Sequence, residues 1–450
     1  MKRSFPFQDL VVAALLLPLA ACAQTAPTVP VPAAPAAVAP ATAAPVPSAL
    51  SQPLTQQQFA SCVQNLAQQT ALSGRPLRRE DFERIAAGGR YDDRVRQSML
   101  VTTTEPTFWW DELAATTDED RVQQGRAILA RERDALQRIE TQFGVPKEIV
   151  LAIYGIETNF GPASGRIPVL DASLSLVCLR PCPPTATAPG SCMARERAFA
   201  AVRLLRDRRV QPESFVGSWA AAFGRTQFVP DTYELVAVDG DGDGVADIIN
   251  SERDAWASTA NHLKQRGGWR MGEPVYLEVS IPQEQRAEFA ARDNSIRLTD
   301  RAKRLSEWTA MGWRVLAPNA VTPQPGSDPE LYPFLPVGLP GPAFLVSRNF
   351  DTVLRYNRSE RYVMEVSLLA NKIAGGTDFV TAWPTDDPGL TRAQVRDLQN
   401  WLVQRGHAQV VADGVIGRVT RDAIAAERAA KGLPAGRRVG QRTMRELMQP

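Results

Sequence analysis

Residues 146–159 constrain the fold more than any other segment, because they combine the apolar spacing of a helix with a carboxyl group at one end. Val150, Ile153 and Glu157 fall on one face of the expected helix, and two further isoleucines flank them. Desolvation disfavours the charged form of such a carboxyl group and raises its pKa. A carboxyl group that stays protonated near neutral pH can act as a general acid. The competing interpretation is a glutamate that reaches solvent where the helix ends.

The N-terminus, residues 1–21, has the features of an export signal. Lys2 and Arg3 supply positive charge, and the apolar run at 11–20 is too short to span a bilayer comfortably. The run ends in the sequence LAAC, which resembles the lipobox of bacterial lipoproteins. That resemblance implies acylation of Cys22 and, since no Asp follows it, a periplasmic protein anchored to the outer membrane. If an ordinary signal peptide is cleaved near Ala21 instead, Cys22 is incidental.

Composition divides the rest of the chain into four parts. Residues 22–53 are almost entirely Ala, Pro, Thr and Val, which favours a semi-extended linker. Residues 54–382 follow a mostly helical pattern and form the expected catalytic domain. Residues 383–389 contain two prolines and two aspartates, which indicates a second linker. Residues 390–450 form a small C-terminal unit.

Two shorter patterns refine this division. Alternating or short apolar runs within 274–316 and 343–347 indicate a small β-containing subdomain inserted in the helical domain. Thr391 and Gln394 fit a capping box at the start of the first helix of the C-terminal unit. We therefore predict a mainly α fold of the α+β type.

The cysteines fit an oxidising compartment. Apart from Cys22 the chain has an even number of them, which favours disulfides; they are Cys62, Cys178, Cys182 and Cys192. Four cysteines allow three pairings, and the sequence does not choose among them. A zinc site is disfavoured, because no histidine lies near the cluster and one cysteine is far away in sequence.

Charge and histidine content exclude several classes of protein. The net charge of +2, without a long Lys/Arg run or a nucleic-acid motif, argues against a nucleic-acid partner. The only histidines are His262 and His407, which disfavours a His-rich metal site and a Ser-His-Asp hydrolase. We expect a monomer without an organic cofactor.

Three motifs carry a resemblance to a known family. They are GIETNFG at 155–161, GSW at 217–219 continued by GRTQFVP at 224–230, and RYNRS at 355–359 with Tyr362. Their order and spacing are similar to those of the membrane-bound lytic murein transglycosylase B family, over about residues 55–375. The resemblance implies a lysozyme-like helical core in which Glu157 is the sole catalytic acid and base.

The resemblance also implies a set of residues lining the cleft around the sugar. They are Ser218, Gln227, Tyr356, Asn357 and Tyr362. The amides and the Ser hydroxyl suit sugar hydroxyl and N-acetyl groups, and Tyr offers a flat ring and a hydroxyl. Ordinary core packing is the competing interpretation for the tyrosines. The chain departs from the family at three positions: Ala221 replaces a Gly, Phe223 replaces a Met, and His262 replaces a Tyr. Residues 178–192 resemble an insertion, which we expect to be a loop held by a disulfide at the rim of the cleft.

The sequence DGDGDG at 239–244 matches the front of a calcium loop, with acidic residues at alternate positions. Asn250 replaces the usual Glu at the twelfth position, and the resemblance implies a longer EF-hand-like loop closed by Asp254. The candidate ligands are Asp239, Asp241, Asp243, the carbonyl group of Val245, and Asp254. The competing interpretation is a solvated Asp-Gly turn. We expect a structural Ca²⁺ apart from the acid.

The C-terminal unit contains DGVIGRVTR at 413–421, which resembles the repeat signature of the three-helix peptidoglycan-binding domain. Glu427-Arg428 replaces the usual Phe-Gln pair of that signature.

Together the resemblances imply non-hydrolytic cleavage of the β-1,4 bond between N-acetylmuramic acid and N-acetylglucosamine in peptidoglycan glycan strands, leaving 1,6-anhydro ends. Such chemistry needs one carboxyl group rather than the usual pair. The competing functions are a hydrolytic muramidase and a non-catalytic wall-binding lipoprotein.

Overall fold

The structure is a computed structural model that describes residues 50–100, 107–291, 294–321 and 326–449. The expected signal peptide, Cys22 and most of the first linker lie outside these residues. Among the described residues, no helix is both long enough and apolar enough to cross a membrane.

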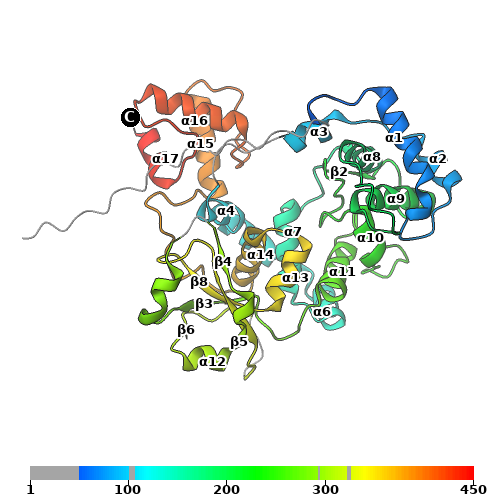
Figure 1. Cartoon of the computed structure of the whole chain (residues 1–450). Helices are drawn as coiled ribbons and strands as arrows, with labels where there is room; N and C mark the ends of the chain where they lie inside the picture. Colours follow the sequence, from blue (N-terminus) through cyan, green and yellow to red (C-terminus); the bar gives the residue numbers. More distant parts are fainter. Residues whose placement is uncertain (1–49, 101–106, 292–293, 322–325, 450) are drawn as a thin grey trace, which may run out of the picture. The chain divides into compact units, whose positions relative to one another are not determined.

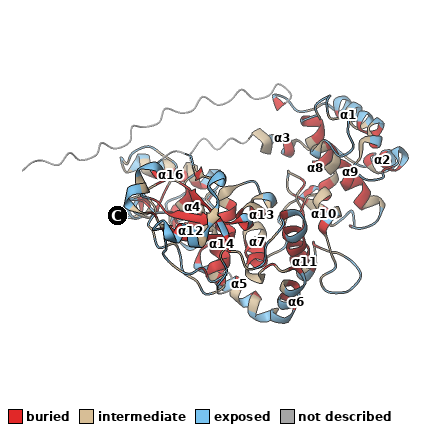
Figure 2. Ribbon diagram, turned by 60° about the horizontal axis from the view of Figure 1, so that its bottom comes forward, coloured by how far each residue is buried: buried red, intermediate tan, exposed pale blue. Residues whose placement is uncertain are grey.

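A central group of helices surrounds α7 (Figure 1). It consists of α4 (Trp109–Thr116), α5 (Glu119–Arg131), α6 (Arg133–Phe143), α7 (Lys147–Thr158), α11 (Glu252–His262), α13 (Arg348–Tyr356) and α14 (Glu360–Ile373), with a π-helical turn, η3 (Leu263–Gly267), after α11. Helix α7 packs against α14, α5, α6 and α11. Its residues from Ile149 to Gly155 are all buried, as the red segment in Figure 2 shows, because neighbours cover it on several sides.

A second helical group contacts the central group through α10, which packs against α11. It consists of α1 (Gln56–Gln68), η2 (Thr70–Leu72), α2 (Arg79–Ala86), α3 (Asp93–Leu100), α8 (Val169–Leu179), α9 (Met193–Arg206) and α10 (Pro230–Val236), with the short antiparallel pair β1 (Ile167–Pro168) and β2 (Val216–Gly217). Two disulfides hold this group together. Cys62 pairs with Cys178, joining α1 to α8, and Cys182 pairs with Cys192.

The inserted β-containing subdomain is an antiparallel sheet with the strand order β4-β7-β8-β3-β6, and β5 pairs with β7. Its elements are β3 (Tyr276–Ser280), η4 (Gln283–Phe289), β4 (Ile296–Arg297), η5 (Thr299–Arg301), β5 (Lys303–Arg304), α12 (Leu305–Ala310), β6 (Arg314–Val315), β7 (Glu330–Leu335) and β8 (Ala343–Val346). The sequence did not predict β7. Pro333 interrupts its pattern and pairs with Leu345 inside the sheet, where a proline cannot donate a backbone hydrogen bond.

The C-terminal unit is a three-helix domain of α15 (Arg392–Gln404), α16 (Arg418–Ala430) and α17 (Gln441–Met448). The predicted capping box at Thr391 and Gln394 is confirmed, since both reciprocal hydrogen bonds are present. Leu398, Leu402, Ile424 and Leu447 form its small apolar core. The predicted mainly helical fold with an inserted sheet and a three-helix C-terminal domain is therefore confirmed.

Candidate active site

Glu157 lies in the last turn of α7, at the end of the apolar stripe. The helix ends at Asn159, whose left-handed backbone (φ 54°) is typical of a C-cap. Phe160 also has a positive φ (59°) and folds back, so that its ring lies only 2.6 Å from where a Cβ on Gly155 would stand. Burial raises the pKa of Glu157 to about 7, against a smaller lowering by its hydrogen bond to Tyr362. The carboxyl group can therefore exist in both its protonated and its ionised form near neutral pH.

Tyr362 is the direct partner of this carboxyl group. It lies in the first turn of α14, where the Ser359 hydroxyl caps the helix by accepting the Tyr362 N–H at 3.3 Å. The phenol donates to Oε1 of Glu157 at 2.6 Å. Burial, with the nearby negative charge of Glu157, raises the pKa of Tyr362 well above its usual value. The phenol thus keeps its proton and stabilises the carboxylate form of Glu157.

Tyr356 forms the next layer of the site. Its ring lies parallel to that of Tyr362, with 6.2 Å between centroids and 8° between planes. Its hydroxyl donates to the carbonyl oxygen of Thr226 at 2.6 Å. The third motif therefore holds the second motif in place beside Glu157.

The second motif is a tightly folded loop. Ala221 (φ 63°) and Gln227 (φ 54°) both have left-handed backbones, which cost energy for residues other than Gly and often mark functional sites. The side-chain amide of Gln227 donates to the Gly224 carbonyl at 2.9 Å. Thr158 ties this loop to α7, because its hydroxyl donates to the carbonyl oxygen of Arg225 at 2.7 Å.

Among the described residues, Tyr362 is the expected cleft residue that forms a hydrogen bond with Glu157, and Ser218 and Asn357 bond neither to it nor to Tyr362. The hydroxyl of Ser218 accepts the N–H groups of Ala220 (3.3 Å) and Ala222 (3.2 Å) within its own turn. Asn357 is exposed just after α13, and its side chain has no hydrogen bond within the described residues. Hydrogen bonds and ring stacking therefore join Glu157, Tyr362, Tyr356 and the loop of the second motif, whereas the side chains of Ser218 and Asn357 have no direct link to Glu157 within the described residues.

His262, the departure noted in the sequence, packs behind Tyr356. It is 6% exposed, and its ring centroid lies 4.8 Å from that of Tyr356 and 5.8 Å from that of Phe228. Burial lowers the pKa of His262 to about 4, so the imidazole is neutral at physiological pH.

A pocket of about 500 Å³ contains Glu157. It is lined by the end of α7, by α4, and by residues of the C-terminal domain that include Arg392 and Arg421. Arg392 and the buried Arg121 both donate to Oδ1 of Asn159, at 2.5 and 3.2 Å. The sequence analysis did not identify either arginine as a site residue, because their contacts with Asn159 join segments that are far apart in sequence.

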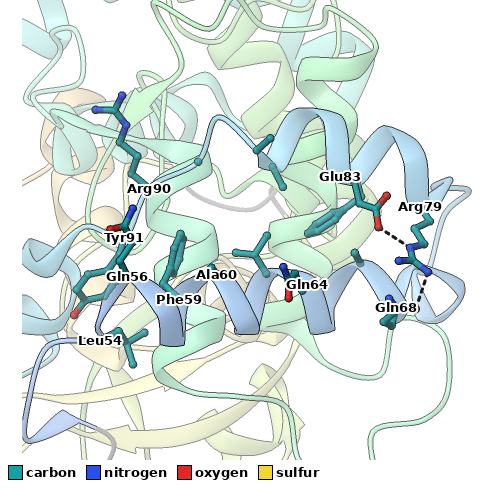
Figure 3. A pocket seen from close by; sticks show the side chains of 16 residues that line it. Leu54, Gln56, Phe59, Ala60, Gln64, Gln68, Arg79, Glu83, Arg90 and Tyr91 are labelled. Atoms are coloured by element: carbon teal, nitrogen blue, oxygen red, sulfur yellow. Dashed lines mark hydrogen bonds and ion pairs between the residues drawn. The ribbon is translucent and has the colours of Figure 1, made fainter.

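A larger groove of about 910 Å³ runs between α1 and α2 and has no part in this site (Figure 3). It is lined by apolar residues such as Phe59 and Phe82, together with charged residues at its rim. The inserted loop 178–192 also lies apart from the site: Gly190 donates to the Leu72 carbonyl at 3.0 Å, and none of its residues lines the pocket around Glu157.

Glu365 is a second buried carboxyl group that sequence reasoning missed. It follows Tyr362 by one turn of α14, and burial, with the nearby charge of Glu112, raises its pKa to about 7. No hydrogen bond joins Glu365 to Glu157 within the described chain. Glu365 does not line the pocket, whereas Glu157 does, together with Asp111 and Glu112 of α4, and among the described residues Glu157 has a tyrosine hydrogen-bond donor.

The acidic loop gathers four carboxylates. Asp239, Asp241, Asp243 and Asp254 each offer an oxygen within 4.8 Å of the others. Fully buried Asp254 accepts the N–H groups of Gly240 (2.7 Å) and Asp247 (2.7 Å), which fixes the carboxylate that would close the loop. This all-oxygen donor set fits a hard divalent cation. Val245 lies on the same loop, its N–H donating to Asp243 at 2.8 Å.

The fold and the site together define a class of protein: a helical enzyme domain with one desolvated carboxyl group in a pocket, joined to a small three-helix domain. Residues 58–371 match the family described as Transglycosylase SLT domain, and residues 391–447 match a peptidoglycan binding domain. The first match covers more than half of the chain, so the chain belongs to the SLT transglycosylase family of peptidoglycan-cleaving enzymes. The family resemblance drawn from the three motifs is confirmed.

Individual relatives agree with this assignment. Membrane-bound lytic murein transglycosylase B of Escherichia coli (strain K12) is 30% identical over 263 residues, which span 57% of this chain and 64% of that relative, less than two thirds of its length. SltB3 from Pseudomonas aeruginosa, solved in complex with NAG-anhNAM-pentapeptide, is 34% identical with a TM-score of 0.61, covering 87% of this chain and 100% of that one. Slt35 of Escherichia coli in complex with calcium is 25% identical with a TM-score of 0.52, covering 70% of this chain and 92% of that one.

Proposed function

We propose that this protein is a lytic murein transglycosylase that cleaves the β-1,4 bond between N-acetylmuramic acid and N-acetylglucosamine and leaves 1,6-anhydromuramic acid ends. The observation that carries the proposal is the hydrogen bond from Tyr362 to the desolvated Glu157, in a pocket of a chain that belongs to this family. A single carboxyl group whose pKa is near 7 can serve as acid in one step and as base in the next.

The steps follow from the state of Glu157. The protonated carboxyl group gives its proton to the oxygen of the departing N-acetylglucosamine, and the C1–O bond breaks. The positive charge that develops at C1 is spread with the help of the substrate's own N-acetyl group. The Glu157 carboxylate, stabilised by the Tyr362 phenol at 2.6 Å, then takes the proton of the C6 hydroxyl of muramic acid, whose oxygen closes onto C1. The proton returns to Glu157, and no water is consumed.

Glu157→Gln tests this mechanism, because glutamine keeps the shape and the acceptor oxygen but cannot transfer a proton. We expect release of anhydro products from purified peptidoglycan, measured by mass spectrometry, to fall at least about 100-fold. Glu148→Gln, at the other end of α7, is the matched control and is expected to keep wild-type activity. Only hydrated reducing ends from the wild type would indicate a muramidase, and a fully active Glu157→Gln protein would show that Glu157 is not the catalytic group. A wild type that binds peptidoglycan but releases no product would indicate a wall-binding protein.

The remaining site residues are proposed to surround the sugar. Gln227 lies in the loop of the second motif, and the ring of Tyr356 stacks on the ring of Tyr362. These positions support a role for both residues in holding the sugar at the cleavage point. Ser218 and Asn357 make no hydrogen bond with the Tyr362–Glu157 pair in the described chain, and we propose that they contact adjoining parts of the glycan.

We also propose that the acidic loop binds a structural Ca²⁺ through Asp239, Asp241, Asp243, Asp254 and the carbonyl group of Val245. The gathered carboxylates and the calcium-bound relative Slt35 support this. Calcium should raise the Tm by several degrees and EDTA should reverse the rise, whereas Asp241→Asn protein should respond far less. Asp300→Asn, on the inserted subdomain, is the control. Identical melts with calcium and EDTA would contradict the proposal.

For localisation, we propose a periplasmic lipoprotein, acylated on Cys22 and anchored to the outer membrane as a monomer. The lipobox-like sequence and a relative named as membrane-bound support the anchor. Cys22→Ala should abolish incorporation of labelled fatty acid and release the protein from the membrane fraction. Retention of the label in the variant would contradict acylation at this cysteine.

A further inference from the structure

A basic cavity of about 760 Å³ lies next to the catalytic centre but takes no part in the proton transfers. It is formed where α11 and the turn η3 meet the end of α13, the start of α14 and strand β4. Arg266, Arg297, Arg355 and Arg358 line it, against only two carboxylates, Asp351 and Glu360. The cavity therefore has an excess of positive charge.

Both carboxylates are already engaged. Asp351 accepts the phenol of Tyr332 at 2.8 Å and lies 3.8 Å from Nη1 of Arg297. Glu360 accepts the hydroxyl of Ser295 and lies 3.5 Å from Nε of Arg297. Arg297 is thus the cation that these two acids neutralise between them.

The other arginines differ in their partners. Nη1 of Arg355 donates to the Gly267 carbonyl at 2.6 Å, which holds its guanidinium against η3. Arg266 and Arg358 are exposed and have no hydrogen bond or ion pair with any described residue. Two free guanidinium groups in one cavity attract a carboxylate, because their forked N–H groups match its two oxygens.

One buried polar group in the cavity wall also lacks a partner. Nδ1 of His262 makes no hydrogen bond within the described chain, whereas Nη1 of Arg297 is paired by charge with Asp351. Buried polar groups are normally hydrogen-bonded, and each exception calls for an explanation. Water held with a polar ligand in this cavity would supply the missing partner of His262.

The cavity is linked to the catalytic carboxyl group by stacked rings. The His262 ring lies against Tyr356, Tyr356 lies parallel to Tyr362, and Tyr362 donates to Glu157. The basic cavity is therefore separated from the catalytic carboxyl group by a layer of three packed rings, and a substituent on a sugar bound at Glu157 would reach the cavity around the edge of this layer. Both complexes of the relative SltB3 contain a disaccharide that carries a pentapeptide, and such a peptide ends in a carboxylate.

We propose that this cavity binds a carboxylate of the peptide attached to the muramic acid of the substrate, through Arg266 and Arg358. The proposal rests on the function proposed above, because it assumes that the glycan binds at Glu157. It makes the protein selective for glycan strands that still carry their peptides. His262 and Arg297 form the floor of the cavity and position the peptide end.

The test compares glycan strands with and without peptides, the latter prepared with an amidase. In Arg266→Gln/Arg358→Gln protein, we expect the preference for peptide-bearing strands, taken as the ratio of kcat/KM values, to fall about tenfold, mainly through KM. Arg133→Gln/Arg138→Gln is the matched control: it removes two exposed arginines of α6 that form no ion pair with a described residue, and it should leave the ratio unchanged. An unchanged ratio in the cavity variant would overturn the proposal.

A binding measurement separates this proposal from the proposed function. In Glu157→Gln protein, calorimetry with NAG-NAM-pentapeptide and with the peptide-free disaccharide measures the cavity's contribution without turnover. We expect the added double substitution to weaken only the binding of the pentapeptide ligand, about tenfold. If the wild type forms no anhydro product, the proposed function fails, and this binding comparison still decides whether the cavity recognises the peptide. Equal affinities with and without the arginines would reject it.

Discussion

At the scale of single residues, activity should depend on one proton on Glu157. Its pKa of about 7 means that the acid form is lost as pH rises through 7, so kcat/KM should fall tenfold per pH unit above that value. Tyr362→Phe removes the phenol that stabilises the carboxylate, which raises the pKa of Glu157 further. We therefore expect the descending limb of the pH profile of anhydro-product release to move to higher pH, together with a lower maximal rate.

Tyr233→Phe is the control for this shift. Its buried hydroxyl donates to the Ala246 carbonyl at 2.6 Å and does not contact the Glu157 carboxyl group. Removal of this hydroxyl should therefore leave the descending limb of the pH profile at the wild-type pH. A limb that moves to lower pH in Tyr362→Phe would show that the phenol does not stabilise the carboxylate.

Glu157 was predictable because its signal is local, an apolar stripe that ends in an acid. Its partner Tyr362 is 205 residues away, so only the resemblance of three motifs could bring the two together. Arg121 and Glu365 carried no local signal at all. Their burial depends on which helices cover them, and the spacing of apolar residues along one helix does not predict which other helices pack against it.

At the scale of elements, the two disulfides should contribute unequally to stability. A cross-link stabilises mainly by restricting the unfolded chain, and the effect grows with the length of the closed loop. Cys62–Cys178 closes 116 residues and Cys182–Cys192 only 10. Replacing the first pair by serine should lower the free energy of unfolding by up to about 5 kcal/mol, and replacing the second by up to about 3 kcal/mol.

Denaturant unfolding of the two double variants, with the wild type under oxidising conditions, measures this difference. Equal losses would indicate that native-state strain or packing, rather than loop length, sets the contributions.

The sequence predicted disulfides but could not choose their pairing, because the pairing depends on how α1 packs against α8. The same limit applies to the sheet, where β4 and β5 are too short to leave a periodic pattern, whereas β6 falls in a short apolar run that the sequence indicated.

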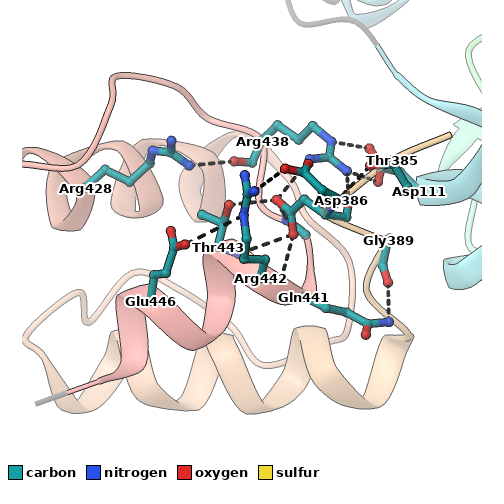
Figure 4. A network of polar contacts seen from close by, with 12 residues as sticks. Asp111, Thr385, Asp386, Gly389, Arg428, Arg438, Gln441, Arg442, Thr443 and Glu446 are labelled. Carbon is teal, nitrogen blue, oxygen red and sulfur yellow. Dashed lines mark hydrogen bonds and ion pairs between the residues drawn. The ribbon is translucent and has the colours of Figure 1, made fainter. Parts of the chain in front are cut away.

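At the scale of the whole molecule, the catalytic and C-terminal domains meet through charged contacts. Arg438 forms two hydrogen bonds of 2.9 Å with Asp111 of α4 and also bonds Asp387 (Figure 4). Asp387 is 4% exposed and accepts N–H groups at the start of α17, so it organises the C-terminal domain internally. Asp111 is therefore the residue whose loss weakens docking without disturbing this internal network.

Asp111→Asn should loosen the docking and expose the segment 383–389. We expect cleavage in this segment by a broad-specificity protease to become several-fold faster, while the melting of each domain changes little. Because residues of the C-terminal domain line the pocket around Glu157, KM for polymeric glycan should rise as well. Asp422→Asn, which breaks an exposed ion pair with Arg437 inside the C-terminal domain, is the control. If both variants were cleaved at the wild-type rate, the Asp111–Arg438 contact would not hold the domains together. Docking would then depend on the other polar contacts between the domains, which join Arg392 to Asn159 and Arg396 to Asp120.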